Sequence, residues 1–273
     1  SVSKVFTTGC PTCYCNLRLK NIVRLGGSAS KLHLLLLLAA VNMDEQALTH
    51  LKALLESMVY YSTVNQIKTN ELERLYAQWC KQIREIHTDE ELTSFINNKI
   101  KPTISQWKVN NRFNFMRIGF DSMQQYRVKF ILARITKYVD VRRKNGGDAS
   151  NVAEFYEGGI EIEHIMPQKY SAAYGISEDD YNAAKQRLGN LTLLEKTINA
   201  SIGDDAFASK SEAYKQSAYY LTRSIAQLDD VGQQTAINRM NQKLRSWSSW
   251  GPSMIEDRQA ILYDLSEEIW SID

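Results

Sequence analysis

Apolar residues recur every three or four positions through most of the first hundred residues, which is the spacing of one buried face of an α-helix. Ser30 and Asp44 stand before two such stretches and belong to the residue types that cap helix N-termini. The pattern predicts helices at residues 31–42, 44–60, 65–86 and 89–100, with Pro102 ending the block. We therefore expect residues 1–105 to form a helical scaffold or docking region, because no catalytic spacing occurs in it.

The helical spacing returns after residue 120 and continues to the C-terminus. It predicts helices at residues 121–139, 177–188, 208–227, 231–244 and 254–270, the second of them capped by Ser177. Trp247 and Trp250 lie in a short turn before the last helix, where they could stack on bases or pack a terminal helix onto a core; packing is the preferred interpretation. The fold class predicted by these patterns is mainly α, a helical bundle.

A different pattern occupies the middle of this second region, at about residues 158–203. Residues 159–164 alternate apolar and acidic positions up to Glu163 and His164, and Pro167 follows, which is typical of a short strand ending at a turn. A Gly-Asn turn at Asn190 then leads into the apolar run 191–194, and residues 195–202 have the character of a helix. Strand, insert, strand and helix is the order of elements in a ββα-metal (HNH) nuclease finger, which we expect to be embedded in the bundle.

The residue types in this segment suit phosphodiester hydrolysis. A neutral imidazole such as His164 is the usual base near neutral pH. A divalent ion in an oxygen-rich site can act as Lewis acid, and Glu163 and Asn199 can offer it a carboxylate and an amide oxygen. Because neighbours on a strand point to opposite faces, Glu163 and His164 need a bend if both are to point inward. Asn190 is expected to hold the loop by hydrogen bonds.

Three strings carry a resemblance to a known family: EHIMPQ at 163–168, RLGNLTLLE at 187–195 and INASI at 198–202. Together they resemble the C-terminal nuclease domain of GmrSD-type, modification-dependent restriction enzymes, which belongs to the HNH group. The nine-residue interval from Asn190 to Asn199 also fits that group. Many residues match the family over 159–226, and a few more match beyond it, at Trp250, Ile255 and Arg258. One departure is Asp204, where an Asn is expected.

The resemblance implies a role for each matched residue. His164 would be the general base, Glu163 and Asn199 would bind the metal, Mg²⁺ with Mn²⁺ as the alternative, and Asn190 would be the structural member of the catalytic set. The chain would then divide into residues 1–105 and a nuclease domain at 106–273 that includes the C-terminal helices. The substrate would be double-stranded DNA, modified or plain.

Composition adds little to this picture. The chain has 273 residues and a formal net charge of +2, so DNA binding would have to depend on local patches. Lys169, Lys185, Arg187 and Lys196 flank the motif and could contact phosphates, although as isolated residues they would be ordinary surface cations. The longest apolar run, residues 34–41, is far below the roughly 20 residues that a membrane span requires. With no signal peptide evident, we expect a cytoplasmic protein.

The cysteines leave two interpretations open. Cys10, Cys13 and Cys15 include a Cys-x-x-Cys pair, which is half of a zinc ligand set, but no second pair follows at finger spacing. Reduced thiols are the simpler interpretation of these three residues and of Cys80.

These observations predict a metal-dependent DNA endonuclease or nickase module of a prokaryotic anti-phage restriction system. The resemblance also implies an NTPase domain that senses DNA modification. The nearest string to that domain's signature, residues 121–127, lies in a predicted helix, so we expect the sensing part elsewhere in the polypeptide or in a partner. The alternatives are a catalytically inactive DNA-binding or regulatory module, and a helical interaction protein.

Overall fold

The computed structural model describes residues 14–27, 31–230, 232 and 235–272, and the side chains of residues 14–16 are outside that description. The chain forms two compact units, residues 1–115 with 270–273 (unit 1) and residues 116–269 (unit 2). The sequence patterns predicted a division after residue 105. Within the described residues, no helix has both the length and the apolar character needed to cross a membrane.

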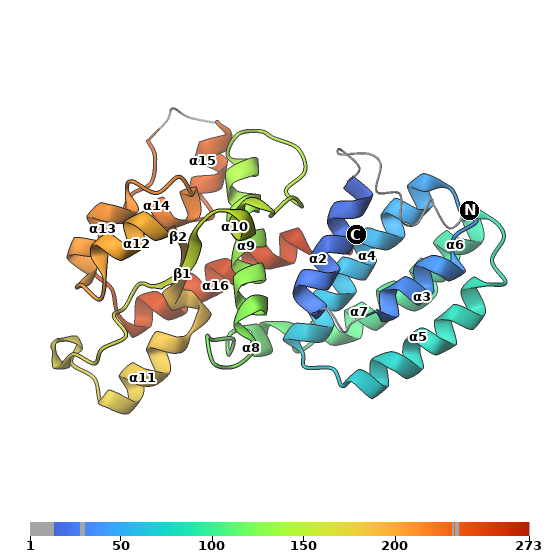
Figure 1. The fold of residues 1–273 in the computed structure, drawn as a ribbon, viewed down its shortest axis with the longest axis horizontal. Helices are drawn as coiled ribbons and strands as arrows, with labels where there is room; N and C mark the ends of the chain where they lie inside the picture. Colours follow the sequence, from blue (N-terminus) through green and yellow to red (C-terminus); the bar gives the residue numbers. More distant parts are fainter. Residues whose placement is uncertain (1–13, 28–30, 231, 233–234, 273) are drawn as a thin grey trace. The chain divides into compact units, whose positions relative to one another are not determined.

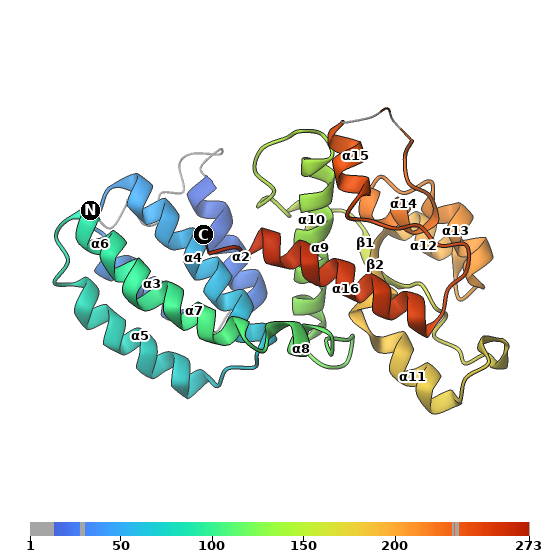
Figure 2. The ribbon, with the colours of Figure 1, turned by 180° about the vertical axis from the view of Figure 1, so that it is seen from behind.

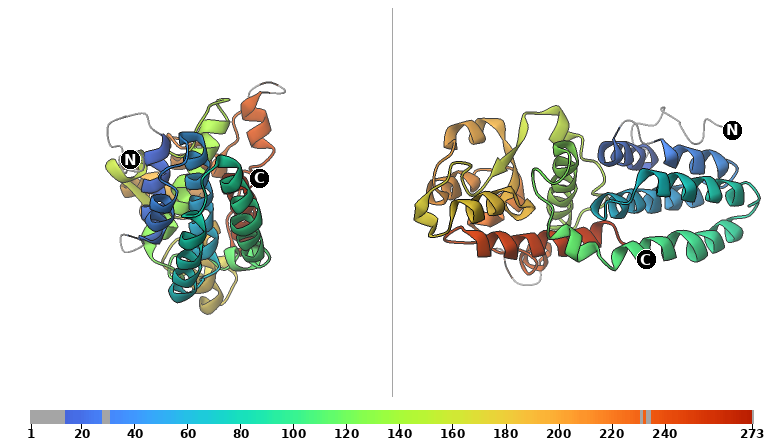
Figure 3. Two further views of the ribbon diagram at one scale, coloured as in Figure 1. Left: turned by 90° about the vertical axis from the view of Figure 1, so that its right-hand side faces the viewer. Right: turned by 90° about the horizontal axis from the view of Figure 1, so that it is seen from below.

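Unit 1 is built from helices that run roughly along one direction (Figures 1 and 3). Its elements are α2 (Tyr14–Gly26), α3 (Leu32–Ala39), α4 (Glu45–Val64), α5 (Thr69–Ile83), α6 (Asp89–Phe95), the π-helical turn η1 (Ile96–Ile100), α7 (Lys101–Lys108) and α8 (Asn111–Phe115). Asp44 caps α4 as predicted, since its side chain accepts a 2.6 Å hydrogen bond from the backbone N–H of Ala47. Ser30, the predicted cap of α3, lies outside the described residues.

The prediction that Pro102 ends the helical block is wrong. The chain stays helical to Lys108, with Pro102 in the first turn of α7. The backbone N–H of Lys101 bonds to the carbonyl of Ile96, five residues back, so the π turn η1 directly precedes the proline. Proline is tolerated in a first helical turn, where its missing N–H is not needed.

Leucines and aromatic residues form the core of unit 1. Leu51, Leu55 and Met58 of α4 are fully buried, on the face that the spacing predicted. Tyr60 stacks on Trp270 with ring centroids 3.8 Å apart. Burial of this apolar surface is what holds the helices together.

Unit 2 consists of helices around a two-stranded sheet, which confirms the mainly α prediction with a small β element (Figure 2). Its elements are α9 (Gln125–Arg142), α10 (Glu154–Glu157), β1 (Ile160–His164), η2 (Ala172–Tyr174), α11 (Glu178–Gln186), η3 (Leu188–Asn190), β2 (Leu191–Glu195), α12 (Lys196–Ile202), α13 (Phe207–Tyr214), α14 (Tyr220–Ala226), α15 (Ala236–Asn241) and α16 (Pro252–Ile269). Strand, insert, strand and helix follow in the predicted order.

The strands β1 and β2 pair antiparallel in a regular register. Ile160 lies opposite Glu195, Ile162 opposite Leu193, and His164 opposite Leu191. The sequence required a bend between Glu163 and His164 if both side chains were to point inward. The strand is regular through both residues, and the chain bends only after it, at residues 165–166.

The helix predicted over residues 208–227 is two helices, α13 and α14. Within the break, the two carboxylate oxygens of Glu195 accept hydrogen bonds from the Ser217 hydroxyl at 2.9 Å and the Ala218 N–H at 2.7 Å. The polar groups of the break are thus bonded by a residue far away in sequence, which local spacing does not reveal.

Candidate active site

His164 ends β1 and is 4% exposed. Its ring lies edge-on to Phe120, with centroids 4.9 Å apart, and its Nδ1 is 3.3 Å from the side-chain amide nitrogen of Gln168. Its Nε2 has no hydrogen-bond partner among the described residues. Burial, together with the positive charges of Lys210 and Lys185, lowers the pKa of His164 from 6.5 to about 4. The imidazole is therefore neutral at neutral pH and has one buried nitrogen without a partner.

Asn190 is fully buried, and both ends of its amide are bonded. Its Oδ1 accepts from the backbone N–H of Met166 at 2.7 Å and from the indole of Trp250 at 2.9 Å. Its Nδ2 donates to the carbonyls of Met166 at 3.2 Å and Lys185 at 2.9 Å. These bonds hold the chain just after His164 against the turn before β2.

The N-terminal half of α16 packs against the same turn. Arg258, 2% exposed, donates to the carbonyls of Gly189 at 2.8 Å and Leu191 at 2.7 Å, and the Gln259 side chain accepts from the N–H of Gly189 at 3.1 Å. A Cβ on Gly189 would lie 2.0 Å from the carbonyl oxygen of Ile255, so no other residue fits there. Burial lowers the pKa of Arg258 to about 9.

Trp247 and Trp250 are buried in the core of unit 2, which confirms packing as their role. Trp250 also stacks on Phe207, with centroids 5.4 Å apart. Its hydrogen bond to Asn190 links the turn before α16 to the site. Arg258 and Gln259 link α16 itself, although no sequence pattern singled out Gln259. The weak family resemblance at Trp250, Ile255 and Arg258 was the sequence signal that could have predicted this link.

Glu163 is 6% exposed, and its carboxylate is paired with other side chains of the protein. Its Oε1 accepts from the ammonium of Lys210 at 2.7 Å and from the hydroxyl of Tyr214 at 2.9 Å. Lys210, 1% exposed, also donates to the backbone carbonyl of His164 at 2.7 Å. Burial raises the pKa of Glu163, and Lys210 opposes that rise. No sequence pattern singled out Lys210 or this buried pair.

Asn199 contacts a different carboxylate. Its amide nitrogen donates to Glu161 Oε2 at 2.9 Å. Glu161 lies opposite Leu194, nearer the start of β1, and alternation puts Glu161 and Glu163 on one face of the strand and His164 on the other. The structure thus joins Asn199 to Glu161, a residue that sequence reasoning did not select.

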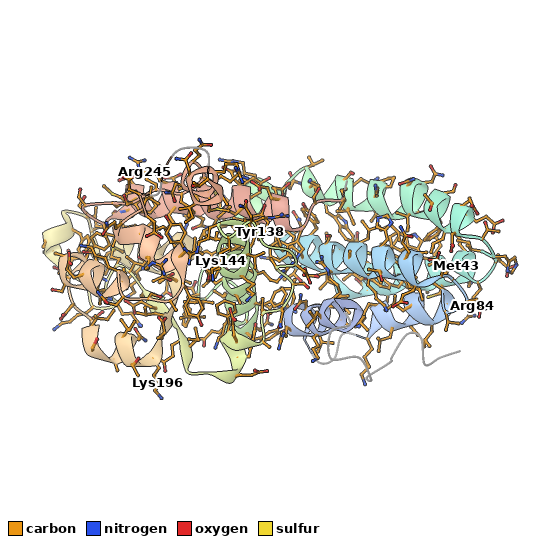
Figure 4. The ribbon with its side chains drawn as sticks, turned by 90° about the horizontal axis from the view of Figure 1, so that it is seen from above. Met43, Arg84, Tyr138, Lys144, Lys196 and Arg245 are labelled. Atoms are coloured by element: carbon orange, nitrogen blue, oxygen red, sulfur yellow. The ribbon has the colours of Figure 1, made fainter. Side chains whose placement is uncertain are left out.

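The four flanking cations differ in their surroundings. Lys169 and Lys196 are exposed, and Figure 4 shows Lys196 extending away from the ribbon. Lys185 and Arg187 are half-buried and bound within the protein, Lys185 to the carbonyl of Gln168 at 2.7 Å and Arg187 to the Gln259 side chain at 3.4 Å. Lys169 and Lys196 are therefore the better placed of the four for phosphate contacts.

Comparison with protein families gives a match to the C-terminal domain of GmrSD restriction endonucleases, over residues 107–265. The matched segment is more than half of the chain and contains every site residue described above. The chain belongs to the GmrSD C-terminal domain family. No curated protein matches the sequence. Membership in the GmrSD family gives the chain a restriction-endonuclease type of role, with DNA as the implied substrate.

The arrangement of side chains bears on the metal that a GmrSD-type nuclease would use. Among the described residues, no group of three or more His, Cys, Asp and Glu is close enough together to hold an ion. The two predicted ligands each have another partner: Glu163 has Lys210, and Asn199 has Glu161. An ion bound by Glu163 would compete with the ammonium of Lys210, so this arrangement does not fit a metal between Glu163 and Asn199.

The cysteine cluster adds no information about metals. Cys10 and Cys13 lie outside the described residues, and the side chain of Cys15 does too. Cys80 is a half-buried free thiol in α5, and burial raises its pKa. A thiol with a raised pKa is a poor nucleophile at neutral pH.

Proposed function

We propose that this chain is a DNA endonuclease or nickase that hydrolyses phosphodiester bonds with His164 as the general base. The observation that carries the proposal is the buried, neutral imidazole of His164, whose Nε2 has no partner among the described residues. It lies on the strand–turn–strand framework that Asn190 holds together, within a restriction-endonuclease family match.

In the proposed reaction, Nε2 of His164 takes a proton from a water molecule as the water oxygen attacks phosphorus. The bond from phosphorus to the leaving sugar oxygen then breaks, and that oxygen takes up a proton from solvent water. A phosphate beside the ring would raise the pKa of His164 from its low value, because a neighbouring negative charge favours the imidazolium. A positioned general base contributes typically about 10²- to 10⁴-fold to the rate.

We further propose that cleavage requires a divalent cation, Mg²⁺ or Mn²⁺, which would stabilise charge on the phosphate oxygens. The roles of Glu163 and Asn199 as ligands stay predictions, since binding at Glu163 would require Lys210 to release that carboxylate. No step above depends on the ion. Chelation tests the requirement: cleavage should stop with chelator and return with added Mg²⁺.

The family match supports a role in restriction, and we propose that this role is directed against phage, in the cytoplasm, on double-stranded DNA that is modified or plain. An NTPase domain in the same polypeptide or a partner protein would then sense the modification. Relaxation of supercoiled plasmid, modified and unmodified, is the direct test with wild type and His164→Ala. His87→Ala, at an exposed residue of unit 1, is the control. Cleavage by His164→Ala at the wild-type rate would disprove the role of His164.

A second candidate is a DNA-binding or regulatory domain without catalysis. The observation that favours it is the Glu163–Lys210 pair, which occupies a carboxylate next to the proposed base. Such a domain would shift plasmid in a gel but leave it supercoiled with Mg²⁺ or Mn²⁺, and neither chelator nor His164→Ala would change its binding.

A further inference from the structure

His164 can act as a base through Nε2 only in one of its two neutral forms. A neutral imidazole carries one proton, so Nε2 has a free lone pair only when that proton is on Nδ1. The partner of Nδ1 therefore decides whether the ring is ready to accept a proton. In this structure that partner is the side-chain amide of Gln168, whose nitrogen is placed 3.3 Å from Nδ1.

A glutamine amide can present either end to Nδ1. Its NH₂ group would donate to Nδ1, leaving the proton on Nε2 and the base blocked. Its carbonyl oxygen would accept from Nδ1–H and leave Nε2 free. The Nε2 atom of His164 is buried without a partner in the described part of the chain. A proton on Nε2 would leave a buried N–H donor without an acceptor. Turning the Gln168 amide end for end and placing the ring proton on Nδ1 removes that unpaired donor, so the second arrangement is favoured.

The backbone of Gln168 is held firmly although the residue itself is exposed. Its N–H donates to Asp204 at 2.6 Å, and the next N–H, from Lys169, donates to the other oxygen of the same carboxylate at 2.9 Å. The ammonium of Lys185 donates to the carbonyl of Gln168 at 2.7 Å. Tyr181 donates to the carbonyls on either side, of Pro167 at 2.7 Å and Lys169 at 3.0 Å.

These contacts come from two separate elements: Asp204 lies in the loop after α12, and Tyr181 and Lys185 lie in α11. Their combined effect is to fix the position from which the Gln168 side chain reaches the His164 ring. Asp204 stands where the family resemblance led us to expect an Asn, and its carboxylate accepts both N–H groups at once.

We propose that Gln168 is a positioning residue for His164: its amide oxygen accepts the proton on Nδ1 and so keeps Nε2 free to take a proton from water. Asp204 and Lys185 support this indirectly by fixing the backbone at residue 168. The inference rests on the proposed function, but the tautomer of His164 can be measured without any cleavage.

The first test is spectroscopic. Long-range ¹H–¹⁵N spectra of the ¹⁵N-histidine-labelled full chain at neutral pH distinguish the two tautomers, and His164 is identified by the signals lost in His164→Gln. The expected wild-type result is the Nδ1–H form. In Gln168→Met, which has similar length and no acceptor, the population should move toward the Nε2–H form. A wild-type ring in the Nε2–H form, or a tautomer unchanged by Gln168→Met, would overturn the proposal.

The second test uses kinetics with a conservative rescue. Losing one hydrogen bond of ordinary strength corresponds to about a fivefold to tenfold effect, so kcat of Gln168→Met should fall by about that factor with KM unchanged. Gln168→Glu retains an acceptor and should recover most of the rate. Gln78→Met, at an exposed position of α5, is the matched control. Equal losses in the Met and Glu variants would count against Gln168 as the acceptor.

The two proposals fail in distinguishable ways. If His164→Ala cleaves at the wild-type rate, the general-base function is lost whatever the spectra show. If His164→Ala is inactive but the tautomer does not depend on residue 168, only the role of Gln168 is lost.

Discussion

Two buried histidines, one in each unit, show what separates a core residue from a candidate active-site residue. His33 in α3 is 1% exposed and His164 at the end of β1 is 4% exposed. Burial lowers the pKa of both to about 4. Neither ring nitrogen of His33 has a partner among the described residues, whereas His164 has Gln168 at Nδ1. Burial and a shifted pKa are thus common to both, and neither alone indicates function.

The difference lies in what surrounds each ring. His33 lies on a helix whose other buried residues are Leu36 and Leu37. Around His164, by contrast, the backbone groups of residues 164–169 are bonded by side chains from η3, α11, α13 and the loop after α12. Shifted pKa values cluster at functional sites, but here it is the convergence of these polar side chains that distinguishes the two.

The largest expected effect tests this contrast directly. His164→Ala should reduce cleavage by about 10²- to 10⁴-fold, because it removes the proposed base. His33→Leu should leave the rate per folded molecule unchanged, because it replaces a buried ring without partners by an apolar side chain. Plasmid nicking at equal folded concentration measures both. A comparable loss in His33→Leu would show that the contrast between the histidines is false.

Breaking the ion pair between Glu163 and Lys210 should have the next largest effect. Lys210→Met leaves the buried carboxylate of Glu163 without its cation, which typically costs about 3–5 kcal/mol. Adding Glu163→Gln to that variant should recover part of the loss, because no unpaired charge then remains. Urea unfolding, followed by tryptophan fluorescence, measures the free energy of unfolding. Equal stability of wild type and Lys210→Met would mean that the pair is not formed.

A third comparison separates stability from activity. Asn190→Ala leaves buried backbone groups of Met166 and Lys185 without partners and should cost about 2–3 kcal/mol or more. Leu55→Ala in the core of unit 1 should cost a similar amount, about 2–5 kcal/mol. Only Asn190→Ala should also slow cleavage by molecules that remain folded, since it loosens the chain beside His164. Parallel unfolding and nicking assays on the two variants decide this.

The smallest effect is a pH dependence of stability. Between pH 6.5 and about 4 the unfolded chain protonates His33 while the folded chain does not, because burial lowers its pKa to about 4. The free energy of unfolding should therefore fall as pH falls through this range. His33→Leu should lose less stability than wild type between pH 7 and pH 5, and His87→Leu, at an exposed position, should match wild type. Urea unfolding followed by circular dichroism at both pH values measures the difference.

Much of this architecture was accessible from local patterns. Asp44 and Ser177 cap their helices as predicted, and the alternation before Pro167 marks β1. Caps, alternation and helical spacing act within a few residues of one another, so one sequence contains all the information they need. The order strand, insert, strand and helix around His164, Asn190 and Asn199 follows from these local signals and from the family resemblance.

The contacts of the site depended on residues distant in sequence. Lys210 is 46 residues from the His164 carbonyl that it binds, and Arg258 is 69 residues from Gly189. Spacing within a helix shows only which face is apolar, so a lysine that is buried against a carboxylate of another element has the same local pattern as a solvated one.

By itself, the sequence determined the mainly helical class and the position of the two short strands, because both depend on interactions between near neighbours. The choice of His164 as the candidate base came from its residue type and the family resemblance. Tertiary structure alone decided that Glu163 pairs with Lys210, that Asn199 bonds to Glu161, and that Gln168 reaches the ring of His164. Those pairings arise from how the elements of unit 2 pack against one another, and a buried polar group bonds to whatever partner that packing brings within reach.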